Sequence, residues 1–370
     1  MHSSIVSAAS LIGLSCLSVV SGLPFTYNNN PLGNGFPNIA PGSSQQLAIE
    51  QQAHGSLSNA PPPPTKPQPD SLTSLRLIAF NELFEVAFFT ELLYNLTNNV
   101  PGYEVRHQGA HDFIVRALTA VQAQEELHAL NANNALKHFN ESVILPCQYN
   151  FPVDNFEDAI NLASTFTDVV LGTLQDVQNS FGADGDIGLI RGVGSVIGQE
   201  GEQNGFYRQL LDKVPSALPF LTTSTREFAF SALQGFVVSG TCGNLNAIDL
   251  QIFAPLTVDT QNIAPCSQTL QFSFSAVNSP SSWNSDYSGL SLVYINQQNL
   301  PVVEKIQNAR KDSNNIVTFE ALFPFDDATQ GALFGNGLTI AAVTNSSGPF
   351  ATADLVAKST VFGPGLIEIN

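Results

Sequence analysis

The chain has 370 residues, a formal net charge of −18 and only 12% charged residues. An acidic surface of this kind repels polyanions, so we expect neither nucleic acid nor anionic membranes among its partners. The length predicts two domains.

Residues 1–22 predict a secretory signal peptide. The apolar run from Ile5 to Val20 is followed by the small residues Ser21 and Gly22 and then by a polar stretch. The run is shorter than the roughly 18 apolar residues that mark a transmembrane helix. No later segment reaches that length without polar interruption. We therefore expect a secreted protein, extracellular or in the cell wall, without a membrane anchor.

Three sequons are consistent with secretion, because Asn-x-Ser/Thr accepts glycans along a eukaryotic secretory route. Their asparagines are Asn95, Asn140 and Asn345. The sequence therefore predicts a glycoprotein with three acceptor sites.

Three cysteines remain once Cys16 leaves with the signal peptide: Cys147, Cys242 and Cys266. One disulfide and one free thiol is the simplest arrangement in a secreted protein. All three pairings are open. We favour Cys147 with Cys242, since each would end a helical segment, and keep Cys242 with Cys266 as the local alternative. No two cysteines form a C-x-x-C pair, which excludes a zinc knuckle.

Residues 23–74 predict a disordered spacer. The segment contains Asn28 to Asn30, a glutamine-rich patch from Gln45 to Gln52, and the proline run from Pro61 to Pro64. Such a composition buries too little apolar surface to offset the entropy lost on ordering.

Helical periodicity begins after this spacer and recurs until about residue 240. The predicted helices span 74–97, 112–139, 154–181, 187–211 and 224–238. Pro146 and Pro152 lie in the 141–155 connection, where they prevent a continuing helix. Fully extended, its fifteen residues would reach about 50 Å at ~3.3 Å each. A long crossover between two antiparallel helix pairs predicts a bundle of four or five helices over 75–240.

Two-residue alternation replaces the helical pattern from about residue 245. The predicted strands span 269–275, 290–295, 315–323, 338–343 and 356–362. Asn336-Gly337 is a hairpin signal before the fourth of them. Several short strands separated by turns predict a β-sandwich-like domain over 245–370. The fold class is therefore α+β multidomain, with the bundle first.

Two of the bundle helices carry residues that suit a metal site. A di-metal carboxylate site takes one Glu from each of two helices and a Glu-x-x-His from each of the other two. Glu125 and His128 form one such pair, and the three-residue step places them on one helix face. On the first helix we choose Glu85 as the inward ligand, because it lies among apolar neighbours. Glu82 lies one turn earlier.

The second half of the ligand set is incomplete. The fourth helix offers Glu200 followed by Gln203, and an amide oxygen is a weaker ligand than imidazole nitrogen. The third helix has Thr167 and Asp168 at the equivalent level, and Asp168 would serve only if that helix were rotated. Four of six expected ligands are thus present: Glu85, Glu125, His128 and Glu200. Carboxylate and imidazole ligands fit iron or manganese.

Other residue patterns are weaker candidates. His107 and His111 have the four-residue spacing of a metal clip, but the pattern is more typical of an exposed helix start. Trp283 and Tyr287 lie close together in a Ser-rich loop and suit stacking on a sugar, although a covered hairpin tip is the commoner outcome. The chain lacks the Gly-x-Ser-x-Gly elbow of serine hydrolases and a phosphate-binding glycine loop.

Residues 72–240 resemble the ferritin-like domain of secreted fungal stress-response and late-sexual-development proteins, and are similar to plant desiccation-related proteins. The resemblance is carried by Leu77 to Glu85, Glu125 to His128, Pro146 to Pro152 and Ile197 to Gln203. It implies a ferritin-like bundle with a role in stress or development. The family pattern has His where Gln203 stands and Glu near Thr167, so this chain departs from it at two ligands.

Three functions follow as hypotheses. The leading one is a secreted, non-enzymatic stress- or development-associated protein with a degenerate di-metal site, acting at the cell wall or matrix. The second is an iron- or manganese-dependent oxidase or peroxide scavenger. The third is a carbohydrate- or protein-binding role of the β-rich domain. The sequence predicts neither the oligomeric state nor a substrate.

Overall fold

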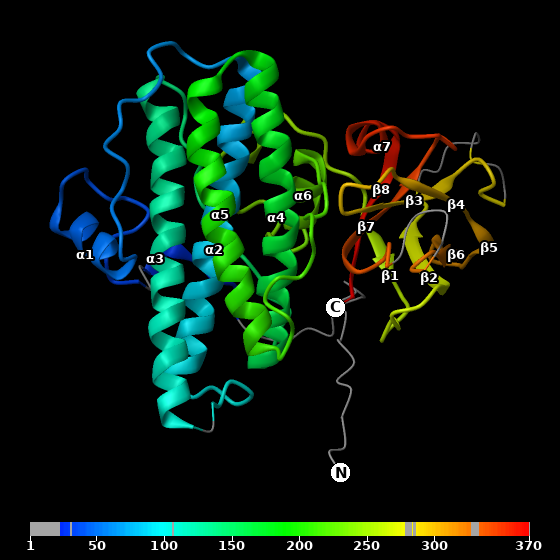
Figure 1. The fold of residues 1–370 in the computed structure, drawn as a ribbon, viewed down its shortest axis with the longest axis horizontal. Helices are drawn as coiled ribbons and strands as arrows, with labels where there is room; N and C mark the ends of the chain where they lie inside the picture. The colour runs from blue at the N-terminus through cyan, green and yellow to red at the C-terminus, as the bar shows by residue number, and fades with distance from the viewer. Residues whose placement is uncertain are drawn as a thin grey trace.

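The computed structural model describes residues 23–29, 32–105, 107–277, 283, 286–326 and 333–369. The predicted signal peptide at 1–22 lies outside these residues. The described chain forms a helical bundle followed by a β-rich domain (Figure 1). The α+β architecture expected from the sequence is confirmed. Within the described ranges, no helix is both long and apolar enough to span a bilayer.

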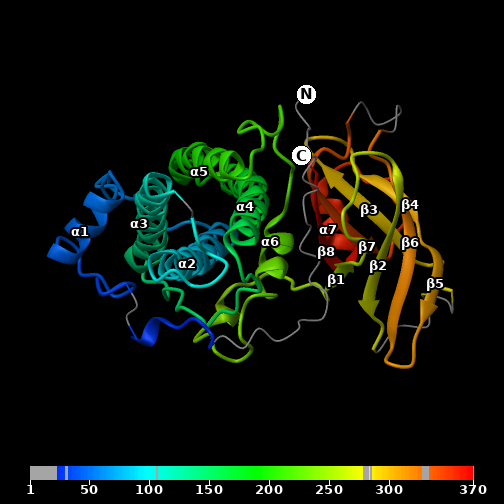
Figure 2. The same cartoon turned by 90° about the horizontal axis from the view of Figure 1, so that it is seen from below.

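Four long helices make the bundle and run as two antiparallel pairs (Figure 2). Their bounds are α2 Pro69–Thr97, α3 Gln108–His138, α4 Phe156–Asp184 and α5 Ile190–Leu210. The predicted ranges agree with these bounds within a few residues, because long amphipathic periods are strong signals. A short 3-10 turn, η2 Ile187–Leu189, lies between α4 and α5.

Local capping explains where α4 begins and ends. The side chain of Asn155 accepts a hydrogen bond from the backbone of Asp158, which satisfies a free amide of the first turn. At the other end Gly185 has φ +79°, the left-handed conformation that glycine adopts at no steric cost. The sharp turn into η2 and α5 follows from that residue.

The crossover between α3 and α4 is an ordered ribbon. Tyr149 pairs with Phe25 on one side and with Val237 on the other. The rings of Tyr149 and Phe151 pack edge-on against Phe84 in the bundle core, with centroids 5.9 and 5.8 Å away. Pro146 and Pro152 exclude a helix here. Tyr149 and Phe151, which lie between them, pack the extended chain against the bundle.

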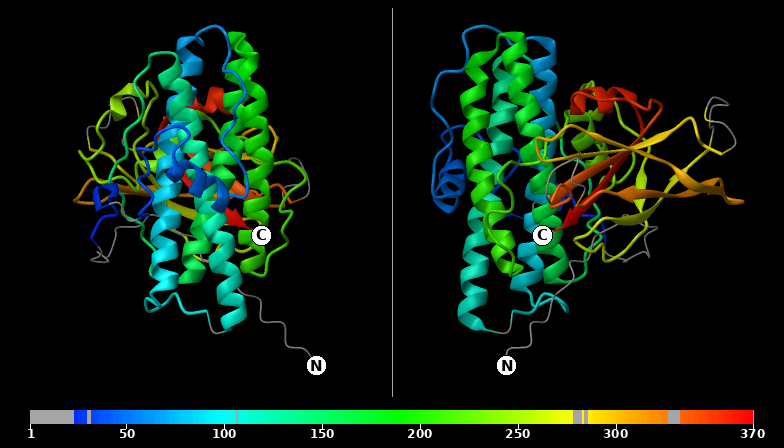
Figure 3. Two further views of the ribbon diagram at one scale, coloured as in Figure 1. Left: turned by 90° about the vertical axis from the view of Figure 1, so that its left-hand side faces the viewer. Right: turned by 45° about the vertical axis from the view of Figure 1, so that its right-hand side comes forward.

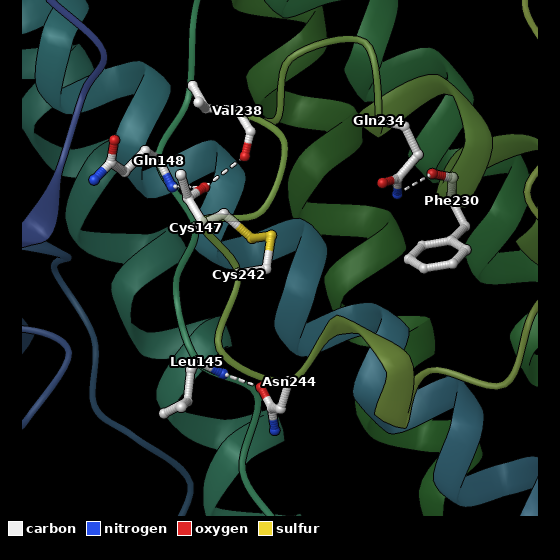
Figure 4. The surroundings of a disulfide bond; sticks show 9 residues. Leu145, Cys147, Gln148, Phe230, Gln234, Val238, Cys242 and Asn244 are labelled. Carbon is white, nitrogen blue, oxygen red and sulfur yellow. Dashed lines mark hydrogen bonds between the residues drawn. A yellow bond between two sulfur atoms is a disulfide. The ribbon is translucent and has the colours of Figure 1, made fainter.

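A disulfide joins this crossover to the loop that follows α6 Arg226–Leu233 (Figure 4). The bond links Cys147 with Cys242, the pairing favoured from the sequence, across a separation of 95 residues. The backbone of Leu145 donates to Asn244 Oδ1 nearby, at 3.0 Å. Cys266 is exposed and free.

The segment before α2 differs from the disordered spacer predicted over 23–74. It contains η1 Tyr27–Asn29 and α1 Ser44–Gln52, and α1 packs against α3 (Figures 2 and 3). Tyr27, Phe36 and Ile49 are buried in the same core as the bundle helices. A few widely spaced apolar side chains thus anchor this polar segment to the bundle. The average composition of the segment, on which the prediction of disorder rested, does not reveal them. The segment ends at Gln68, since α2 begins at Pro69, five residues before the predicted start.

The β-rich domain consists of two four-stranded antiparallel sheets. One sheet has the order β1-β2-β6-β5 and the other β4-β3-β7-β8. The strands are β1 Leu256–Val258, β2 Gln268–Ser275, β3 Ser291–Asn296, β4 Val302–Lys305, β5 Gln307–Lys311, β6 Ile316–Phe323, β7 Gly337–Thr344 and β8 Thr360–Ile369. A 3-10 turn, η3 Leu245–Ala247, precedes them.

A shared core between the sheets gives the predicted sandwich. Phe272 and Phe319 of the first sheet cluster with Tyr294 of the second. The predicted strand over 356–362 is a helix in its first half, α7 Ala353–Ser359, because Thr352 caps that turn by accepting from the backbone of Leu355. Trp283 and Tyr287 are packed inward, with their rings against Phe362 and Phe274, which fits the covered hairpin tip rather than the sugar platform.

The second sheet also packs against the bundle, so its central strands are covered on both faces. Val293, Ile295 and Ile340 belong to a cluster with Val169 of α4 and Phe228 of α6. Every residue of β7 is buried, and apart from Gly337, Thr339 and Thr344 its side chains are apolar. The side chains of β7 alternate between the sandwich core and the face that packs on the helices.

The predicted glycan acceptors lie at the surface to different degrees. Asn140 and Asn345 are exposed, whereas Asn95 is half-buried in the last turn of α2. Whether any of the three carries a glycan stays a prediction.

Candidate metal centre

Four side chains from three bundle helices converge on one point inside the bundle. They are Glu82 of α2, Glu125 and His128 of α3, and Glu200 of α5. One ligand atom from each lies within 4.8 Å of the others. No second group of three or more such ligands occurs in the part of the chain that the structure describes.

Helical spacing brings these residues to one level. Glu125 and His128 are three residues apart, so both face the bundle interior from adjacent turns of α3. Glu82 lies in the most deeply buried part of α2, where its neighbours Phe80 and Leu83 are inaccessible to solvent. Polar groups at this depth require partners, because unpaired burial is costly.

His128 lies at the centre of the group. Its Nδ1 is 2.9 Å from Glu125 Oε2, 3.5 Å from Glu82 Oε2 and 4.0 Å from Glu200 Oε1. One imidazole therefore faces three carboxylates, each almost inaccessible to solvent.

Burial dominates the electrostatics of the carboxyl groups of Glu82 and Glu200. It raises the pKa of Glu82 to about 7 in spite of the opposing attraction of His128. Burial, with repulsion from Glu82 and Glu125, raises the pKa of Glu200 well above its usual range. For His128, burial lowers the pKa, but Glu125 and Glu82 outweigh it, so the pKa is raised well above the ordinary value. A cation at this point would favour the ionised forms of Glu82 and Glu200.

The donor atoms fit a single cation. Neither carboxylate oxygen of Glu200 has a hydrogen-bond partner although both are buried, and Glu82 Oε2 is in the same position. Buried polar atoms are nearly always satisfied, so these unpaired acceptors leave room for a water molecule or a cation as their partner. Three hard oxygen ligands and one imidazole suit iron or manganese.

Gln203 occupies the place where a second imidazole was expected. Its Nε2 donates to Glu125 Oε1 at 2.6 Å and to Gln124 Oε1 at 3.1 Å. The Tyr207 hydroxyl donates to Gln203 Oε1 at 3.4 Å. One carboxylate oxygen of Glu125 therefore accepts from the Gln203 amide, within a network that also contains Gln124 and the Tyr207 hydroxyl.

The remaining long helix of the bundle, α4, contributes no ligand to the group. Asp168 Oδ1 accepts from the side-chain amide of Asn204 at 2.9 Å. Burial raises the pKa of Asp168 to about 6. Its neighbour Thr167 is buried but is no metal ligand in this group. The rotation of α4 that would bring Asp168 inward does not occur.

The structure brings together three of the four residues predicted as ligands: Glu125, His128 and Glu200. Glu85 lies outside the group, and its Oε1 accepts from the side-chain amide of Asn81 at 3.2 Å. Burial and repulsion from Glu125 raise its pKa well above the usual range. Glu82 takes its place, which sequence reasoning missed. Asn81, four residues before Glu85, was the signal that Glu85 has a local partner.

The histidines near the start of α3 are separate from this group. His111 Nε2 lies 3.3 Å from the carbonyl oxygen of Leu96, and His107 is the N-cap residue of the helix. A cavity of about 10 Å³, room for about one water molecule, touches Glu82 from the side of α4, and Glu125, His128 and Glu200 do not line it.

Comparison with known proteins points to the same helices that carry the candidate metal centre. The family model described as "Ferritin-like domain" matches residues 75–213, from the first turns of α2 to just beyond α5. All four converging side chains lie inside that match. No curated protein matches the chain. The bundle is therefore a ferritin-like domain.

Proposed function

We propose that this ferritin-like domain holds one iron or manganese ion between Glu82, Glu125, His128 and Glu200. The observation that carries the proposal is the set of buried carboxylate oxygens without a hydrogen-bond partner beside an imidazole. When bound, such a metal supplies a redox-active, Lewis-acidic centre. The protein's part is to orient the four ligands and to keep bulk water away from them.

A single ion is favoured over the pair that the family pattern implies. The group contains one imidazole, and Gln203 already donates to the second oxygen of Glu125. Asp168 is engaged by Asn204 on the far side. A second cation would find no further nitrogen ligand in this group and would have to displace an amide donor.

We assign metal retention rather than turnover of an organic substrate. The ligand set is incomplete for the di-metal chemistry that the family pattern implies, because Gln203 stands where a second imidazole was expected and donates to Glu125. Peroxide consumption that is lost in Glu125→Ala would favour the oxidase hypothesis instead.

The metal ligands can be tested by isosteric variants. Metal content of the purified secreted protein, measured by mass spectrometry without chelators, should be about one ion per chain. Glu82→Gln and Glu200→Gln should each lose most of it, because each removes an anionic ligand. Glu85→Gln is the matched control: its carboxyl is already paired with Asn81, so occupancy should persist. Loss in Glu85→Gln together with retention in Glu82→Gln would restore the sequence-based assignment.

The wider role that we propose is a secreted one, in stress survival or development at the cell wall or matrix. The disulfide supports an oxidising compartment, and the resemblance of residues 72–240 supports the biological setting. Deletion of the gene should impair stress survival or fruiting. A deletion strain that behaves as the parent in both would contradict this role.

A further inference from the structure

A second site lies between the bundle and the sandwich, away from the metal ligands. A cavity of about 460 Å³ is enclosed by α4, α6, β1 and β8, elements that face one another in Figures 1 and 2. Pockets for drug-sized ligands commonly measure roughly 300–1,000 Å³. This cavity is therefore large enough for a small organic molecule.

The cavity has an apolar interior and an accessible mouth. Leu162, Phe236 and Val258 line it and are buried. Ile252 and Pro255, also in the lining, are exposed, and Ile252 is a large apolar side chain left 49% accessible. An apolar molecule could enter at that rim and remove those surfaces from water, which is the main driving force for such binding.

One end of the cavity is polar but balanced in charge. Lys213 and Glu368 are the two charged residues of the lining, and they attract one another. The ammonium of Lys213 also donates to Asn161 Oδ1 at 3.3 Å. Further carboxylates, Asp168 and Glu157, act on the same ammonium. An anionic head group would compete with these acids, whereas a hydroxyl can accept from Lys213 and donate to Glu368.

We propose that this cavity binds a neutral, mainly apolar small molecule with a hydroxyl head group, such as a long-chain alcohol, its head at Lys213 and Glu368. The chain of the ligand lies along Leu162, Phe236 and Val258. This site is independent of the metal centre, because it uses none of the metal ligands.

The test uses the full-length secreted protein and Nile red, a neutral dye that fluoresces in apolar sites. Oleyl alcohol should displace the dye at concentrations at least tenfold lower than oleic acid, both below their aggregation limits. Ala232→Trp should fill the cavity from α6 and weaken dye binding at least tenfold. Leu366→Trp fills it from β8 and serves if the first variant does not fold.

The control is Ala183→Trp, an exposed residue of α4 outside the lining, which should bind the dye as the parent does. Circular dichroism and metal content should be unchanged in every variant scored. Unaltered dye binding in a folded cavity variant overturns the site. Displacement by oleic acid as effective as by oleyl alcohol overturns the neutral head group.

Discussion

At the scale of single residues, we expect Gln203 to limit the proposed metal centre to one cation. Its amide donates to Glu125 where a second imidazole would otherwise supply a nitrogen ligand. We expect Gln203→His to raise the metal content above one ion per chain, as measured by mass spectrometry. Gln199→His is the matched control, since the Gln199 amide donates to Gln124 rather than to a ligand carboxylate. An unchanged content in Gln203→His would show that a second site needs more than this nitrogen.

The buried acids should make the metal-free protein less stable as the pH rises. The pKa of Glu82 in the fold is about 7, above its unfolded value near 4.5, so the folded state binds more protons between these values. Its contribution is fully present below about pH 4.5 and is lost by about pH 7. His128, whose pKa is also raised, changes stability in the same direction above its unfolded value near 6.5.

Thermal unfolding measures this effect directly. The midpoint of the metal-free protein should fall between about pH 5 and about pH 8, and bound metal should remove most of the fall. Glu82→Gln should show a smaller decrease, because its amide does not titrate. A metal-free midpoint that rises across this window would refute the electrostatic account of the site.

At the scale of elements, α4 depends on a close approach to the chain before α6. A Cβ on Gly172 would meet the carbonyl oxygen of Thr222, whose hydroxyl donates to Leu338 of β7 at 2.6 Å. Gly172→Ala should therefore destabilise the protein by about 1–3 kcal/mol, since packed backbone must move. Gly198→Ala is the control: nothing lies within 4 Å of its Cβ, and an alanine in the middle of α5 should add up to about 1 kcal/mol. Chemical denaturation distinguishes the two.

The elements predicted from the sequence are longer and more regularly amphipathic than the elements that were missed. The bundle helices have many turns of apolar periodicity, so their positions were predicted closely. Strands β1, β4 and β5 have only three to five residues, and β5 is largely exposed, so they lack a clear alternation. The segment around α1 was missed because a few apolar anchors order a polar chain only through tertiary contacts.

The sequence predicted which helix faces carry the candidate ligands, but not the identity of every ligand residue. The Glu125 and His128 pair followed from spacing, and Glu200 from its place on α5. The choice between Glu82 and Glu85 did not, because both lie in the buried part of α2, one turn apart. Only the three-dimensional rotation of α2 and the bond from Asn81 separate them.

At the scale of the whole molecule, the disulfide closes a loop that contains α4, α5 and α6. A loop of 95 residues restricts the unfolded chain strongly, so Cys242→Ser should lower the free energy of unfolding by about 2–5 kcal/mol. Cys266→Ser should have little effect, since Cys266 is exposed and outside the disulfide. Denaturant titration gives both values, and one reactive thiol per chain is expected once the predicted signal peptide with Cys16 is removed. Equal effects of the two variants would contradict the pairing.

The same closed loop has a consequence for proteolysis. The connection between α5 and α6 contains exposed residues such as Asp212 and Val214, which a protease can reach. A cut there would leave every proposed metal ligand in the first fragment, and α6 with the sandwich in the second. Because Cys147 and Cys242 lie on opposite sides of the cut, the fragments stay covalently joined until a reductant releases them. A nicked molecule would therefore keep the half with the proposed metal ligands tethered to its sandwich.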